Sequence, residues 1–224
     1  IFTRLAADAV GATKMDRPEW GGVNPRNGEV YITLTNNSNR TVATADAVNP
    51  RVYTDMKGSK EQKGNVNGHI VRFVEPTPAA NSFKWDIYLF GAEANADRAT
   101  VNLSGLTADN DLSSPDGLVF SPATGICWIQ TDDGAYTDQT NCMLLAALPG
   151  QVGDGDKKTL KYGDKTVTTH AGKAQTPATL KRFLVGPRGC EITGLCETPD
   201  GRALFVNIQH PGENTRMADV NDPS

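Results

Sequence analysis

The residues best suited to chemistry in this chain are acids, amides and an arginine that stand next to predicted strands. Residues 15–20 read Met-Asp-Arg-Pro-Glu-Trp and bring Asp16, Arg17 and Glu19 within four positions. An arginine guanidinium is a planar fork that matches two phosphate oxygens, and a glutamate carboxylate is a hard oxygen ligand for a cation. Together they could bind an anion and the metal that polarises it. An ion pair between Arg17 and a carboxylate, tying the first helix to the first strand, explains the same residues equally well.

Further oxygen donors follow other predicted strands. Asn36 lies in an amide-rich segment, residues 33–38, and could supply a neutral oxygen to Ca²⁺ or cap a hairpin as an Asx turn, which is the commoner role. Acidic loops further along the chain could coordinate Ca²⁺ or be solvated turns, and no single one is specific. Their acids are Asp109, Asp111, Asp116, Asp132 and Asp133.

The C-terminal third adds one acid and one histidine. Glu191 stands between Cys190 and a β-branched pair, so we expect it to be partly buried, and buried acids are usually paired or metal-bound. His210 precedes Pro211, and a histidine in such a place is more often a loop residue that hydrogen-bonds a carbonyl than a ligand.

Several common kinds of active site have no support in the sequence. The patterns GxSxG, HExxH, GxGxxG and the Walker-type phosphate loop are absent, and His69, His170 and His210 have no suitable Ser or Cys beside them. The four cysteines show no CxxC spacing for zinc. They could form one or two disulfides in an oxidising compartment, or simply be small buried hydrophobes.

Composition limits the possible partners. The chain has 224 residues, of which 38% are hydrophobic, and 22 Lys and Arg against 26 Asp and Glu give a net charge of −4. No apolar run approaches the roughly 18 residues of a membrane span. Lysine and arginine are scattered rather than clustered, so nucleic acid is not an expected partner.

The elements that must position these residues are mainly strands. Residues 2–10 have apolar side chains at helical spacing, and Gly11 is placed as a stop, so we expect a short helix that packs on one face. After it the period changes to two. The strands that this pattern predicts are residues 29–34, 69–74, 83–88, 118–120, 126–130, 143–148, 166–170 and 203–208, whereas 179–185 fits a helix or a strand.

A weak internal repeat indicates the type of β architecture. Turns that contain Pro and then Gly precede apolar runs at residues 24–28, 114–117, 121–125 and 198–201. Such units recur in the blades of β-propellers. We therefore expect a single segment over residues 1–224 that forms a β-propeller or partial propeller of about three to four blades, with long inserted loops such as 154–164.

The ordered succession of several phrases resembles the C-terminal half of the PhoX family of alkaline phosphatases. The likeness runs along nearly all of the chain, and the segments Asp-Arg-Pro-Glu-Trp and Gln-His-Pro-Gly-Glu are the most specific. The other phrases lie at residues 7–15, 31–37, 68–70, 114–117, 128–132, 190–194 and 207–208.

The resemblance implies a β-propeller phosphomonoesterase that is exported by the twin-arginine route to the periplasm or the medium. It also implies a cluster of iron and calcium near the propeller axis that binds phosphate. By the motif, Arg17 would be a catalytic, phosphate-binding residue and Glu19 a catalytic metal ligand. The other metal ligands expected from matching motifs are Asp116, Asp132, Asn36 and Glu191.

One departure from the family affects what this chain can do. The earlier half of the family carries a segment of the type Cys-x-Gly-Gly-x-Thr-Pro-Trp-Gly-Thr-Trp, whose cysteine bridges the irons, and nothing like it occurs here. The chain also opens Ile1-Phe2 without an initiating Met. We therefore expect a part of a longer enzyme that needs its missing N-terminal half, binds iron poorly and turns over little substrate alone.

Two other functions fit the same residues. A non-catalytic propeller module could use Asp116 and Asp132 to hold structural calcium, and a lactonase-like calcium enzyme would share the fold. Anion binding near Arg17 favours a phosphatase, a calcium-dependent melting shift without anion binding favours the module, and phosphate-insensitive lactone hydrolysis favours the lactonase.

Overall fold

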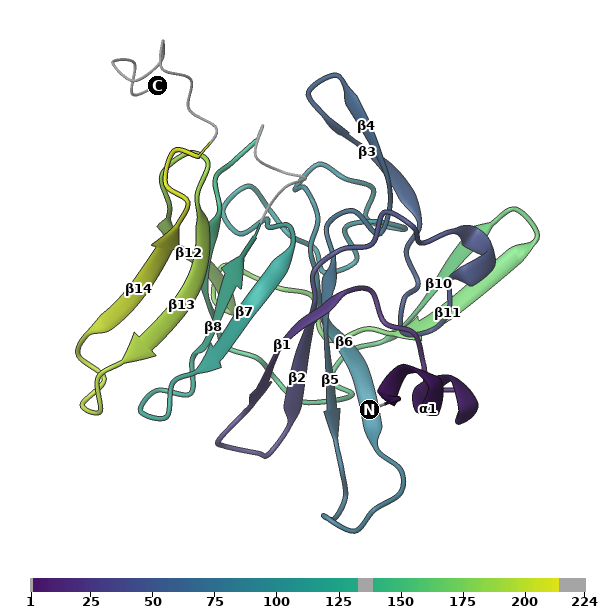
Figure 1. Cartoon of the computed structure of the whole chain (residues 1–224), viewed down its shortest axis with the longest axis horizontal. Coiled ribbons are helices and arrows are strands. Elements are labelled where there is room, and N and C mark those ends of the chain that lie inside the picture. Colours follow the sequence, from purple (N-terminus) through teal and green to yellow (C-terminus); the bar gives the residue numbers. More distant parts are fainter. Residues whose placement is uncertain (1, 133–138, 214–224) are drawn as a thin grey trace.

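Antiparallel strands are the main secondary structure of the computed structural model, which describes residues 2–132 and 139–213 (Figure 1). The mainly β class expected from the period-two pattern is confirmed, and so is the short N-terminal helix. No helix in the described part of the chain is long and apolar enough to cross a membrane.

Two four-stranded antiparallel sheets form the centre of the fold. The first has the order β1-β2-β5-β6 and the second the order β7-β8-β9-β12, so that in both the strands follow one another across the sheet as they do along the chain. The first sheet consists of β1 (Pro18–Val23), β2 (Val30–Leu34), β5 (His69–Val74) and β6 (Lys84–Phe90). The second consists of β7 (Pro115–Phe120), β8 (Cys127–Thr131), β9 (Met143–Ala147) and β12 (Leu180–Val185).

Three hairpins and two short helices complete the described structure. The hairpins are β3 (Tyr53–Lys57) with β4 (Lys60–Gly64), β10 (Lys157–Tyr162) with β11 (Lys165–His170), and β13 (Glu191–Glu197) with β14 (Leu204–Gln209). The helices are α1 (Thr3–Ala9) and the 3₁₀ turn η1 (Val42–Thr44).

Three apolar clusters hold these layers together. The largest lies between the two sheets and includes Tyr31, Leu89, Leu118 and Ile129. A second joins the first sheet to the β10–β11 hairpin, and a third packs the second sheet against β13 and β14. The β10–β11 hairpin, the two sheets and the β13–β14 hairpin therefore lie side by side, as Figure 1 shows.

The repeated turn occupies the same place in three successive layers. It joins β1 to β2, β7 to β8 and β13 to β14, and its glycines Gly28, Gly125 and Gly201 all have a positive φ of 67° to 74°. The prediction for residues 114–117 was wrong, because Pro115 and Gly117 belong to β7. Since the three turns lie at one end of their hairpins, β1, β7 and β13 all begin at the other end (Figure 1).

Other expectations failed for identifiable reasons. Helix α1 buries none of its residues, so the prediction that it packs on one face was wrong. Residues 157–162 form β10 rather than part of a long loop, because their polar side chains alternate on a hairpin that faces solvent on one side. The segment with ambiguous period, residues 179–185, contains β12.

Candidate functional site

An acidic residue stands at the beginning of the first strand in each of the three layers that share the turn. Glu19 is the second residue of β1, Asp116 is the second residue of β7, and Glu191 opens β13. Two further predicted ligands, Asn36 and Asp132, follow the partner strands β2 and β8. Antiparallel pairing puts the end of each partner strand beside the start of the first, so these side chains come from one end of the layers.

The backbone at this end is in an unusual conformation. In the described residues, only Arg17, Ser114 and His210 combine a side chain with a positive φ, at 48°, 52° and 54°. Arg17 and Ser114 directly precede β1 and β7, and His210 directly follows β14, whose last residue pairs with Glu191. Such conformations cost of order 1–3 kcal/mol each and cluster at functional sites.

The sequence analysis did not single out Ser114. Each of the three residues stands immediately before a proline, in Arg17-Pro18, Ser114-Pro115 and His210-Pro211, but most described residues before a proline do not have a positive φ, so the proline is not a specific signal for this backbone. A residue before proline is restricted in conformation, and here the restriction falls at a strand boundary in all three cases.

Arg17 connects three of the predicted site residues. Its Nε donates to Glu19 Oε1 over 2.8 Å, its Nη2 lies 3.5 Å from Asp132 Oδ2, and its Nη1 lies 3.5 Å from Asn36 Oδ1. The side chains are about half exposed for Arg17 and a third exposed for Glu19. The guanidinium is therefore held through Nε, while the 3.5 Å contacts of Nη1 and Nη2 leave these nitrogens able to donate to another oxygen acceptor.

Hydrogen bonds between the two sheets fix how these residues face one another. Thr33 Oγ1 of β2 donates to the Asp116 carbonyl over 2.6 Å, and Thr35 Oγ1 donates to the Pro115 carbonyl over 3.1 Å. Within the second sheet, the amide nitrogen of Asp132 donates to the carbonyl of Ser114 over 3.1 Å. Because the two threonine bonds cross from the end of β2 to the start of β7, the register of the two sheets places Asp116 near Glu19.

The carboxylates are close enough to disturb one another. Partial burial raises the pKa of Asp116 to about 6, helped by the charges of Glu19 and Asp132 and opposed by Arg17. Burial also raises the pKa of Glu191, with a further rise from the charge of Asp132 and from a hydrogen bond with that side chain, while His210 lowers it. The three acids and Glu19 therefore form one electrostatically coupled group.

The donor set of this group is the one that hard cations bind. Glu19, Asp116, Asp132 and Glu191 supply carboxylate oxygens and Asn36 an amide oxygen, as Ca²⁺ prefers. Across residues 2–132 and 139–213, no three acidic, imidazole or thiol groups are arranged closely enough to hold a metal as they stand. Repulsion from neighbouring acids adds to burial in raising the pKa values of Asp116 and Glu191, and a bound cation would relieve that repulsion.

Asp16, next to Arg17 in the chain, points away from this group and is fully buried. Its Oδ1 accepts hydrogen bonds from Asn37 Nδ2 over 2.7 Å and from Arg40 Nε over 2.9 Å, and its Oδ2 accepts one from Asn65 Nδ2 over 3.0 Å. The segment at residues 15–20 is therefore split: the guanidinium and Glu19 face the candidate site, whereas Asp16 faces the interior.

The remaining candidate acids lie elsewhere. Asp111 Oδ1 forms a 2.5 Å ion pair with Arg182 Nη2, which ties the loop before β7 to β12, and Asp109 is exposed. Asp133 lies outside the described residues.

The cysteines and His69 have structural roles. Cys127, Cys142 and Cys190 are buried thiols, as expected for small hydrophobes, and Cys196 is an exposed thiol. His69 is buried, and its pKa is lowered to about 3 by burial and by the charge of Arg51. This imidazole is therefore neutral at physiological pH, and it contacts Asn65 Nδ2 and the Val48 carbonyl, both over 2.9 Å.

A mainly β chain with an arginine set among carboxylates at one strand end is suited to binding cations and an anion together. The family model described as alkaline phosphatase PhoX matches residues 1–212, and the chain belongs to this family. No curated protein matches the chain significantly.

A solved structure supports the same assignment. The chain is similar to Pseudomonas fluorescens PhoX in complex with vanadate, a transition state analogue, with 33% sequence identity and a TM-score of 0.67. The match covers 98% of this chain and 33% of that one. The chain thus spans about a third of the length of this solved relative.

Proposed function

We propose that this chain is part of a metal-dependent phosphomonoesterase that releases phosphate from organic esters. The observation that carries the proposal is the position of Arg17, whose guanidinium lies among Glu19, Asn36 and Asp132 in a chain of the PhoX family. The vanadate complex of the similar Pseudomonas protein adds support, because vanadate mimics a phosphoryl group in transfer.

The fold proposed for the whole enzyme is a β-propeller. Support comes from two four-stranded sheets whose strands run in chain order, followed by a third layer that begins with the same hairpin. In a propeller the first strand of each blade lies nearest the axis. On this reading β1, β7 and β13 line the channel, and Glu19, Asp116 and Glu191 surround its mouth.

Within this site the residues have separate roles. Arg17 would bind the phosphoryl oxygens and neutralise charge on them, since its outer nitrogens have only long contacts in the free chain. Calcium would be held by the oxygen ligands Glu19, Asp116, Asp132, Asn36 and Glu191. Together with residues from elsewhere in the enzyme, these ligands would also hold iron. When bound, these metals supply Lewis acidity toward the phosphoryl oxygens and lower the pKa of a coordinated oxygen nucleophile.

The rest of the enzyme is also part of the proposal. The chain spans about a third of its solved relative, and its sequence lacks the cysteine segment that the family resemblance leads one to expect. We therefore expect that the missing N-terminal half supplies the other metal ligands, and that the whole protein is exported by the twin-arginine route to the periplasm or the medium.

The test is restoration of activity. The 224-residue chain and a version extended by the parts of the relative that the match does not cover should be purified with iron and calcium and assayed with p-nitrophenyl phosphate. The extended version should hydrolyse the ester and be inhibited by phosphate, and the chain alone should show little turnover. A metal-loaded extended protein that neither hydrolyses the ester nor binds phosphate would contradict the proposal.

A further inference from the structure

The conformation of Arg17 needs an explanation, because a non-glycine residue with φ of 48° before a proline is disfavoured twice. Strain of this kind persists only where the surrounding structure over-determines it. The flanking atoms are indeed held. The Arg17 amide nitrogen donates to the Met15 carbonyl over 3.1 Å, and the Arg17 carbonyl accepts from the Thr35 amide nitrogen over 3.1 Å.

The strongest restraint lies one residue earlier, at Asp16. Its carboxylate is fully buried and accepts hydrogen bonds from Asn37, Asn65 and Arg40, the last through Nε and also through Nη2 over 2.7 Å. Its amide nitrogen donates to Asn49 Oδ1 over 3.0 Å. Both the side chain and the backbone of Asp16 are therefore fixed.

The partners of Asp16 hold the preceding backbone as well. Arg40 Nη2 donates to the Lys14 carbonyl over 3.1 Å, and Arg40 Nη1 donates to the Thr44 carbonyl over 2.6 Å. Asn49 Nδ2 donates to the same Lys14 carbonyl over 2.9 Å. Residues 14–16 are thus clamped from two sides, so the chain has to turn at Arg17 to enter β1.

We propose that Asp16 is a positioning residue for anion binding: its buried carboxylate holds the left-handed backbone of Arg17 and so directs the guanidinium into the site. This inference rests on the proposed function, since the anion is the phosphoryl group. Asp16 itself touches neither the site carboxylates nor the expected position of substrate. It acts through the backbone of its neighbour.

A second buried ion pair provides a matched control. Arg72 Nε donates to Asp86 Oδ1 over 2.7 Å, and both side chains are as buried as Arg40 and Asp16. This pair joins β5 to β6, and its further partners are Tyr31, Gly153 and Asp154, none of which belongs to the site. Removing the Asp86 charge leaves a buried arginine that keeps one other carboxylate partner, Asp154. Asp16→Asn and Asp86→Asn should therefore both destabilise the fold and differ in their effect on the anion.

The variants should be made in the extended enzyme and assayed well below their melting temperatures. Asp16→Asn should raise the phosphate inhibition constant and the KM at least about tenfold, with a smaller change in kcat, because a displaced guanidinium binds less well. Asp86→Asn should leave both constants within about twofold of the parent at a similar melting temperature. Equal effects of the two variants would show that Asp16 is merely structural.

Two additions keep the test decisive. If Asp16→Asn fails to fold, Asn37→Ala is the second variant, because it removes one hydrogen bond from the Asp16 carboxylate at a half-buried site. It should still raise the phosphate inhibition constant by about threefold, and an unchanged constant would overturn the proposal.

In the 224-residue chain, NMR should show a strong contact between the Arg17 amide and α protons, which is typical of positive φ. This contact should weaken in Asp16→Asn and not in Asp86→Asn. This signal does not depend on phosphatase activity, so it separates failure of the inference from failure of the proposed function.

Discussion

Arg17 and Glu19 form an ion pair of 2.8 Å across the proline that opens β1. Strand alternation puts residues two apart on the same face. The ion pair keeps Arg17 and Glu19 together in this way, although Arg17 precedes β1 and has a left-handed backbone. Glu19 therefore occupies one edge of the guanidinium in the free chain. If Glu19 binds a cation, as proposed, that edge would become available to an anion.

This geometry predicts different effects for two substitutions of Arg17 in the extended enzyme. Arg17→Ala should weaken phosphate inhibition by about 100-fold or more, because a charge-assisted hydrogen bond contributes about 1.5–3 kcal/mol and two are lost. Arg17→Lys should recover only part of the affinity, since an ammonium group cannot match two oxygens at once.

The matched control for Arg17 is Arg182→Ala. It breaks a partly buried ion pair with Asp111, which ties β12 to the loop before β7 rather than to Arg17 or Glu19. Phosphate inhibition in this variant should equal that of the parent. Unchanged kinetics and phosphate affinity in Arg17→Ala would mean that Arg17 does not bind the substrate.

The raised pKa of Asp116 predicts how the stability of the metal-free chain depends on pH. Its pKa is about 6 in the folded state against 3.8 for the unfolded reference, so the folded chain binds more protons between these values. The free energy of unfolding should therefore fall as pH rises from about 4 to 6, by on the order of 1 kcal/mol for this half-exposed group. Asp116→Asn should remove that fall, as measured by urea unfolding across the pH range.

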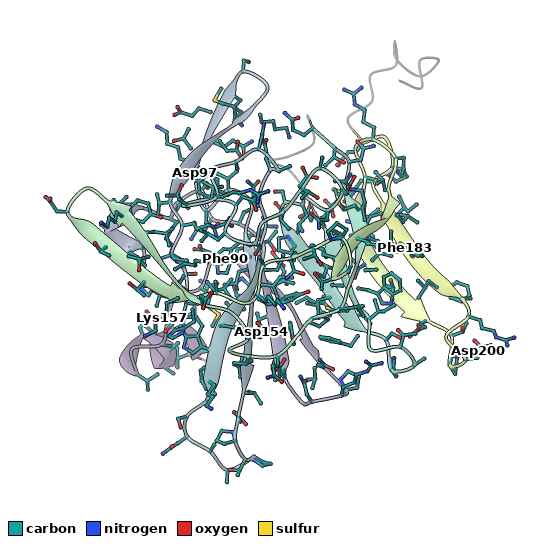
Figure 2. The ribbon with its side chains drawn as sticks, turned by 180° about the vertical axis from the view of Figure 1, so that it is seen from behind. Phe90, Asp97, Asp154, Lys157, Phe183 and Asp200 are labelled. Carbon is teal, nitrogen blue, oxygen red and sulfur yellow. The ribbon has the colours of Figure 1, made fainter. Side chains whose placement is uncertain are left out.

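Asp200 is the control acid for this experiment. Figure 2 shows it at the turn of the β13–β14 hairpin, which is the end opposite to the site. Hydrogen bonds from Thr198 and from the Arg202 amide lower its pKa, so it does not titrate between pH 4 and 6. Asp200→Asn should leave the pH dependence over this window as it is in the parent, and a similar loss of slope in both variants would rule out Asp116 as its source.

Calcium should stabilise the chain in a pH-dependent way. Because a bound cation relieves repulsion among Asp116, Asp132 and Glu191, millimolar CaCl₂ should raise the melting temperature more at pH 8 than at pH 5, where the acids with raised pKa values are partly protonated. The increase in melting temperature on adding calcium should disappear in the double variant Asp116→Asn with Glu191→Gln. Retention of the full gain in that variant would place the calcium elsewhere.

Substitution of Gly68, which lies beside the site, should have a large effect on stability. It has φ of 64°, and a Cβ there would collide with the carbonyl oxygens of Leu34 and Thr35, just before Asn36. Gly68→Ala should cost about 3 kcal/mol or more in chemical unfolding, since backbone must shift. Gly58→Ala, at φ of 57° in open space, should cost only about 1 kcal/mol from backbone strain. Similar costs at the two positions would mean that the carbonyls can move aside.

Much of the fold and part of the site were predictable from local patterns. Period-two alternation identified β5 to the residue, and the Pro and Gly pattern identified the turns that precede β2, β8 and β14. Strand β1 was missed, because Pro18 and two glycines disguise its pattern. Alternation and turn chemistry act over a few residues, so a sequence can report them directly.

Only the tertiary structure determines which of the candidate residues lie close together. Asp16 and Glu19 are three residues apart and of the same chemical type, yet one is buried against Arg40 and the other faces the site. That difference depends on contacts with residues 21 to 49 positions away in the chain, such as Asn65. Likewise, the raised pKa of Asp116 requires β7 to lie beside β2, through hydrogen bonds that span about eighty residues. The sequence by itself therefore determined which residues could bind cations and an anion, and packing between distant segments decided which of them share a site, because burial and proximity are properties of the folded chain alone.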